Sequence, residues 1–234
     1  MVILITLGAL GLAGCGASHS PSTTTHAKPP GHPPPGTGTT PPNTGTTPPG
    51  TGPTQPGGGT LGPEGIPIEQ GTSLAPATTT TPGTPVDGIG CLPSEQIVYH
   101  IHAHLQVDVA GHPRQLPGGI GIIQPVAEQT PEGPLYAASQ CYYWLHTHAA
   151  DGIIHIESPT RRIYTLGEFF DEWRQPLSSD NVAGARGRVT ALVDGKTWTK
   201  SPRAIPLLPR EEVQLEVGMP LLPFVPVSFA RTGL

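Results

Sequence analysis

The chain of 234 residues has few charged and few aromatic side chains, 12% and 5% of its composition. Between Gly16 and Gly90 it has no aromatic residue and only four charged ones, and 51 of these 75 residues are Pro, Gly or Thr. Such a stretch cannot bury enough apolar surface to offset the conformational entropy lost on folding. The sequence therefore predicts a disordered spacer over residues 16–90, either a plain stalk or a carrier of O-linked sugars on threonine.

Long hydrophobic runs are lacking as well. The apolar run that opens the chain is too short to span a bilayer as a permanent helix. It ends in Leu12-Ala13-Gly14-Cys15, directly before the low-complexity stretch, and no Lys or Arg precedes it. These residues resemble the lipobox of bacterial lipoproteins. The resemblance implies a signal peptide over residues 1–15, a lipid on Cys15, and an exported protein anchored to the outer face of a bacterial membrane. The alternative is an ordinary apolar N-terminus.

Cysteine and methionine are scarce. Apart from Cys15, the only cysteines are Cys91 and Cys141, and the only methionines are Met1 and Met219. Two remaining cysteines in an exported domain usually form a disulfide, with free buried thiols as the alternative. The methionine count excludes a Met-rich copper(I) site.

Residues 91–234 form the predicted folded domain, which is of normal single-domain size. They carry 11 Lys and Arg against 14 Asp and Glu. This balance does not indicate nucleic acid or an anionic membrane surface as a partner, and no protein partner is indicated. The chain also lacks a Gly-x-Ser-x-Gly motif, a phosphate loop and a dinucleotide fingerprint.

Strict alternation predicts a strand over residues 97–109, IVYHIHAHLQVDV, with one apolar and one polar face. Thr165 and Glu168 form a predicted capping box for a helix that Pro176 ends, with Phe169, Phe170 and Trp173 on one face. Strands follow after residue 186, and the apolar, Pro-rich C-terminal residues drape over the domain. The predicted fold class is mainly β (α+β), a small antiparallel sheet or barrel-like domain with one short helix.

The stretch CYYWLHTHAADGIIHIE at 141–157 predicts a hairpin. A two-residue turn at Asp151-Gly152 sets His148 opposite His155, whereas a four-residue AADG loop pairs His146 with His155. Both registers place His146, His148, His155 and Glu157 on one face and Cys141 on the other.

Six histidines of the domain fall on two such faces. On the first strand, imidazoles at alternate positions project from one face about 7 Å apart. If the two elements share a sheet, these imidazoles and one carboxylate converge. The predicted metal ligands are His100, His102, His104, His146, His148, His155 and Glu157. The alternative is a solvated strand face. A nitrogen-rich set with one carboxylate suits Zn or Cu, with Ni(II) or Fe(II) as weaker alternatives.

Three longer motifs are specific: YHIHAHL at 99–105, WLHTH and GIIHIESP at 144–159, and TLGEFF at 165–170. In these motifs the domain resembles an uncharacterised family of bacterial exported and lipoprotein domains. The resemblance implies the domain boundaries and the histidine site, but no activity. His102-Ala103-His104 followed by Asp108 is also similar to the HxH element of cupins. However, cupins have Glu where Asp108 stands, and their second motif is missing.

The leading hypothesis is an extracytoplasmic lipoprotein that binds a transition metal for capture, delivery or sensing. A second is a metal-dependent hydrolase or oxidoreductase using the same site, in which Glu157 acts as a base, a ligand or an orienting group. A third is a surface binding module without an ion.

Overall fold

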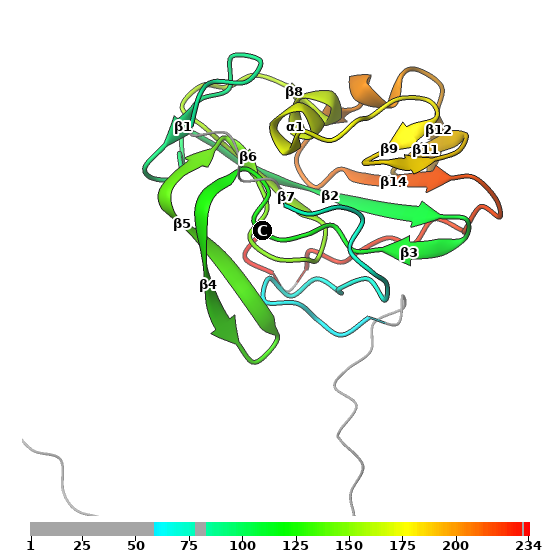
Figure 1. The fold of residues 1–234 in the computed structure, drawn as a ribbon, viewed down its shortest axis with the longest axis horizontal. Coiled ribbons are helices and arrows are strands. Elements are labelled where there is room, and N and C mark those ends of the chain that lie inside the picture. The colour runs from blue at the N-terminus through cyan, green and yellow to red at the C-terminus, as the bar shows by residue number, and fades with distance from the viewer. Residues whose placement is uncertain (1–58, 78–82, 231) are drawn as a thin grey trace, which may run out of the picture. The chain divides into compact units, whose positions relative to one another are not determined.

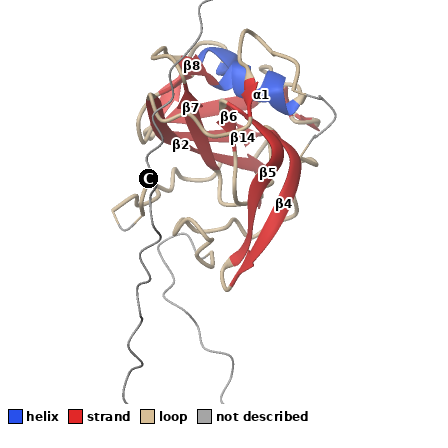
Figure 2. Cartoon of the chain, turned by 90° about the vertical axis from the view of Figure 1, so that its left-hand side faces the viewer, coloured by secondary structure: helices blue, strands red, loops and turns tan. Residues whose placement is uncertain are grey.

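A computed structural model describes residues 59–77, 83–230 and 232–234 (Figure 1). The predicted signal peptide, Cys15 and the spacer residues 16–58 and 78–82 lie outside the described residues. Over the described residues the fold is mainly β, with several antiparallel sheets and one short α-helix, as the sequence predicts (Figure 2). Within the described part, no helix has the length and hydrophobicity needed to cross a membrane.

The largest sheet carries the predicted histidine strand near its centre. Its strands are, in spatial order, β12 (Lys196–Trp198), β11 (Val189–Val193), β14 (Glu212–Val217), β2 (Tyr99–Val109), β7 (Ile153–Ser158) and β6 (Leu145–His146), and β3 (His112–Arg114) also pairs with β2. All neighbours are antiparallel except β14 and β2, which run parallel.

The apolar face of β2 packs into the core together with helix α1 (Leu166–Trp173). Ala103, Leu105 and Val107 of β2 are buried, as are Phe169 and Trp173 of the helix. The predicted capping box is confirmed. The Thr165 hydroxyl accepts the N–H of Glu168, and the Glu168 carboxylate accepts the N–H of Thr165 at 2.7 Å. In Figure 1 the helix lies on one side of β2.

A long β-hairpin was not predicted. It consists of β4 (Ile122–Thr130) and β5 (Gly133–Tyr143), which form a three-stranded sheet with β1 (Cys91–Leu92). This hairpin lacks the clear alternation of apolar and polar residues seen in β2. Its residues Pro125, Pro131 and Pro134 also argue against strands, because proline cannot donate a hydrogen bond to a neighbouring strand. Two short strand pairs lie outside these sheets in the described residues: β8 (Tyr164–Thr165) with β13 (Pro206–Leu207), and β9 (Asn181–Val182) with β10 (Ala185–Arg186). A 3₁₀ turn, η1 (Pro202–Ala204), precedes β13.

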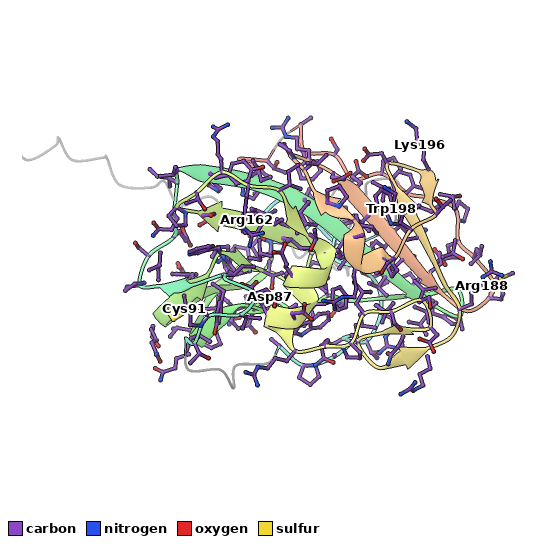
Figure 3. All side chains as sticks on the ribbon, turned by 90° about the horizontal axis from the view of Figure 1, so that it is seen from above. Asp87, Cys91, Arg162, Arg188, Lys196 and Trp198 are labelled. Atoms are coloured by element: carbon purple, nitrogen blue, oxygen red, sulfur yellow. A yellow bond between two sulfur atoms is a disulfide. The ribbon has the colours of Figure 1, made fainter. Side chains whose placement is uncertain are left out.

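The predicted disulfide is confirmed. Cys91 of β1 and Cys141 of β5 form a bond of 2.00 Å between their sulfur atoms. Cys91 lies at the end of the molecule opposite Lys196 and Trp198 (Figure 3). The bond joins two strands of the three-stranded sheet, and β5 is followed directly by β6, which carries His146.

The predicted boundary at residue 91 is too late. Residues 59–77 and 83–90, assigned to the spacer, pack on the domain because they carry apolar side chains. Ile66, Leu74 and Ile89 are buried. The N–H of Leu74 donates to the carbonyl oxygen of Gln115 at 2.8 Å. The sequence does indicate where the folded part begins, because no Leu, Ile or Val occurs from Gly16 to Thr60 and these residues return from Leu61 onward.

The polar face of the sheet is covered rather than solvated. Figure 1 shows residues 59–77 and the C-terminal residues on the side of β2 opposite α1. The N–H groups of Val225 and Val227 donate to the side chains of Gln214 and Glu212 at 3.2 and 2.9 Å. Polar side chains on this face thus lie in a buried interface, as Asp108 of β2 also does.

Candidate metal site

The two histidine motifs meet across neighbouring strands. In the β2–β7 ladder His102 pairs with His155 and His100 with Glu157, and in the β6–β7 ladder His146 pairs with His155. This is the register expected from a four-residue AADG loop, so the two-residue turn at Asp151-Gly152 is wrong. Asp151 is instead buried, and its carboxylate accepts the N–H of Ile153 at 3.3 Å.

Six of the seven predicted ligands come together, and they could hold a metal ion. Their side chains form two groups that share one histidine and one carboxylate, and in each group the four candidate ligand atoms lie within 4.8 Å of one another. The first group is His100, His102, His155 and Glu157, and the second is His146, His148, His155 and Glu157.

His104 belongs to neither group. It lies opposite Ile153, where the β2–β7 ladder ends, and it faces the close-packed backbone of Gly152. Its Nε2 atom is buried without a hydrogen-bond partner among the described residues. Burial lowers the pKa of His104 to about 4, so the side chain is neutral at physiological pH. The alternation correctly predicts that the three histidines of this strand share one face. The imidazole of His104, however, lies too far along the strand to join the other candidate ligands.

His146 and His148 are held in one orientation by the backbone. Nδ1 of His146 donates to the carbonyl oxygen of Tyr143 at 2.8 Å, and Nδ1 of His148 donates to that of Tyr136 at 2.6 Å. A carbonyl only accepts, so both protons are on Nδ1 and both Nε2 atoms present lone pairs in the neutral rings. These two Nε2 atoms lie 3.1 Å apart.

Two facing lone pairs at this distance repel each other unless a proton or a cation lies between them. Burial, followed by the nearby His148 and His155, lowers the pKa of His146 well below its usual value, so the His146 ring does not supply a proton to this contact. Two nitrogens bound to one zinc ion at about 2.0–2.1 Å lie about 3.3 Å apart in tetrahedral geometry. The observed spacing therefore matches two ligands of one ion.

A second histidine pair repeats this spacing on β2. Nε2 of His100 lies 3.1 Å from Nε2 of His102 and 3.2 Å from Oε1 of Glu157. Burial and the charge of His155 lower the pKa of His102 to about 3, which leaves its imidazole neutral and able to ligate a metal.

His155 lies between two carboxylates. Its Nδ1 is 3.2 Å from Oε1 of Glu157, and its Nε2 is 2.6 Å from Oε1 of Glu64. Because carboxylates only accept, both bonds form together when the ring carries two protons. Burial alone would lower the pKa of His155, but the bonds to Glu157 and Glu64 outweigh it and raise that pKa to about 9. His155 thus holds Glu157 in place, and it must lose a proton before it can bind an ion.

Two carboxylates of the site were missed. Glu64 lies in the stretch assigned to the spacer, and Glu95 Oε1 lies 3.3 Å from Nε2 of His148. The only sequence signal for Glu64 is that it is one of four charged residues in an otherwise uncharged stretch. Neither residue lies within a strand, so alternation could not assign it to a face.

Two cavities border the cluster. A cavity of about 310 Å³ is acidic, and its lining includes His148, Glu64, Glu95 and Glu128. Another of about 430 Å³ borders the β2 pair, and its lining includes His100, His102, Pro209 and Arg210. The cluster is therefore bordered by space through which ions and small molecules can approach.

The donor set restricts the chemistry. Neutral imidazoles and carboxylates suit Zn(II) and Cu(II), and the disulfide removes Cys91 and Cys141 as thiolate ligands. A disulfide also indicates an oxidising compartment, as outside the cytoplasm. No protein-family model, curated protein or solved structure matches the chain. The similarity to a family of bacterial exported domains stays a prediction. A functional proposal for this protein therefore has to rest on the geometry of the site.

Proposed function

We propose that this protein binds a transition-metal ion, Zn(II) or Cu(II), through His146, His148 and Glu157, outside the cytoplasm. The observation that carries the proposal is the pair of Nε2 atoms 3.1 Å apart, with both Nδ1 protons committed to backbone carbonyls. Anchoring the distal nitrogen of each ligand in this way is the usual arrangement around protein-bound metals. Glu95 and Glu64 add negative charge beside the ion.

The proposal includes a lipid anchor on Cys15 and a spacer that holds the domain away from the membrane. In that setting the protein captures, delivers or senses the metal. The acidic cavity beside His148 supports this role, because carboxylates raise the local concentration of cations.

The test is the metal content and affinity of the full chain, purified without a histidine tag. We expect at least about one equivalent of Zn(II) or Cu(II) bound tightly at pH 7.5. The variant H146N/H148N should lose that ion, while H112N, at an exposed histidine outside the cluster, should keep it. Less than about a tenth of an equivalent in the unaltered protein would contradict the proposal and leave a metal-free binding module.

A metal-dependent enzyme, hydrolytic or redox, is the second candidate. It is favoured by the cavity of about 430 Å³ at His100 and His102, which also exposes Arg210 to any bound molecule. An enzyme needs a coordination position that the protein leaves free. Titration of the Cu(II)-loaded protein with azide distinguishes the two roles. A shift of the visible absorption bands favours an enzyme, and an unchanged spectrum favours capture or delivery.

A further inference from the structure

Glu157 lies between the two histidine pairs and presents one oxygen to each. Its Oε1 atom lies 3.2 Å from Nε2 of His100, and its Oε2 atom lies 4.0 Å from Nε2 of His146. Two ligands of one zinc ion are at most about 4.2 Å apart when the metal–ligand bonds are about 2.1 Å. The candidate ligands fall into two groups rather than one.

We propose that a second divalent transition-metal ion binds between His100 and His102, and that Glu157 bridges it to the ion at His146 and His148. This inference rests on the proposed function, since it adds a site to the one described there. Two ions joined by a carboxylate are a common arrangement, with the ions about 3.5–4 Å apart. The class of ligand is again a borderline divalent cation, because the site offers imidazole and carboxylate.

Glu157 itself supports the bridge. Its side chain is 3% exposed, and its Oε2 atom has no hydrogen-bond partner among the described residues. A buried carboxylate oxygen without a partner is costly, because it has lost its bonds to water without replacement. Cations on both sides of the carboxylate satisfy both oxygens.

The two ions differ in how they are held. His146 is completely buried and anchored to Tyr143, whereas His100 is 41% exposed and borders the cavity that contains Arg210. The ion at His100 and His102 is therefore the more exposed of the two. The ion at His146 and His148 is more enclosed, because His146 is completely buried, although His148 borders the acidic cavity.

The alternative for the β2 pair is a simple N–H···N hydrogen bond between His100 and His102. This alternative needs no second ion and predicts a single equivalent of metal. The variant H100N separates the two cases. His100 is the most exposed member of the cluster, so we expect its replacement to leave the fold intact. H112N is the matched control.

The experiment is a Cu(II) titration of the full chain, followed by calorimetry and electron paramagnetic resonance. We expect about two equivalents in the unaltered protein and in H112N, and about one in H100N. The two-ion form should show fewer spins than copper atoms, because bridged Cu(II) ions couple magnetically. Full spin intensity should return in H100N.

Two results would overturn the second ion while the proposed function stands. One is a single equivalent that H146N/H148N abolishes and H100N retains. The other is two equivalents with full spin intensity that H100N leaves unchanged, which places the extra ion elsewhere in the chain. Absence of any bound copper or zinc in the unaltered protein would instead contradict the proposed function itself.

Discussion

The carboxylate of Glu64 lies 2.6 Å from Nε2 of His155, although 91 residues separate them in the chain. This contact ties the N-terminal segment of the domain, residues 59–77, to the histidine cluster. On its other side His155 is bound to Glu157, the carboxylate shared by both groups. Glu64, from the stretch that the sequence assigns to the spacer, thus contacts the candidate metal ligand Glu157 indirectly, through the imidazole of His155.

Replacing Glu64 should therefore weaken metal binding without removing a ligand. The variant E64Q keeps the shape of the side chain but removes its negative charge, so its hydrogen bond to His155 is no longer strengthened by that charge. We expect a loss of about 10- to 100-fold in metal affinity, the usual effect of removing a partner that orients a ligand. Competition of the protein with a chromophoric chelator measures this change.

The control for E64Q is E69Q, which alters another carboxylate in the same segment. Glu69 is half-buried, and the raised pKa of its carboxyl comes from burial. Equal affinities in E64Q and E69Q would show that the contact with His155 has no part in metal binding.

Residues 59–77 should also contribute to the stability of the domain. Ile66 is completely buried and packs with Ile153 and Phe229 in a small apolar cluster beneath this segment. The variant I66A leaves a cavity there, and we expect the free energy of unfolding to fall by about 2–5 kcal/mol. Urea titration gives this value, provided that the slope of the transition is unchanged.

The matched control is I97A, because Ile97 is 82% exposed and its truncation should change stability by less than about 0.5 kcal/mol. If I66A behaves like I97A, residues 59–77 are not part of the folding unit.

Much of the site could be predicted because it depends on local patterns. Alternation placed His100 and His102 on one face of β2, and the hairpin brought His146 and His155 together. The choice between registers could not be made from the sequence, because Asp151-Gly152 fits a tight turn equally well. The burial of Asp151 decides it, since a carboxylate with a packing role inside the domain is not free to form an exposed turn.

The rest depends on contacts between distant parts of the chain. Nothing near Glu64 indicates a histidine partner, and nothing near His104 indicates that the ladder ends beside it. The β4–β5 hairpin lacks a clear period of two, so Tyr136, whose carbonyl orients His148, could not be placed. Long-range pairing of this kind becomes visible only once the sheets are assembled.

The disulfide should stabilise the domain mainly by restricting the unfolded chain. Cys91 and Cys141 are 50 residues apart, and closing a loop of this size removes entropy worth about 4 kcal/mol from the unfolded state. We expect a reductant to lower the thermal midpoint of the unaltered protein markedly. The variant C91S/C141S should start at the lower midpoint and show no response to reductant. A midpoint that reductant leaves unchanged would contradict this assignment.

Glu172 should make stability depend on pH. Both oxygens of this buried carboxyl lack a hydrogen-bond partner among the described residues. Burial, together with the nearby Glu168 and Asp87, raises the pKa of Glu172 well above its usual value. The folded state therefore holds this proton more tightly than the unfolded state. The contribution to stability is complete below the unfolded pKa, and it is lost as pH rises through the folded pKa.

The variant E172Q has no ionisable proton at this position, so it should not show this loss of stability as the pH rises. Relative to the unaltered protein, E172Q should gain stability between pH 5 and pH 8, by up to about 1.4 kcal/mol for each pH unit over which only the folded state is protonated. Urea titrations of both proteins at these two pH values measure the difference, in which the contributions of the histidines cancel. E132Q, at an exposed carboxylate, should show no such gain. A difference between E172Q and the unaltered protein that stays constant with pH would mean that Glu172 is ionised inside the folded domain, and that its charge is balanced by its surroundings.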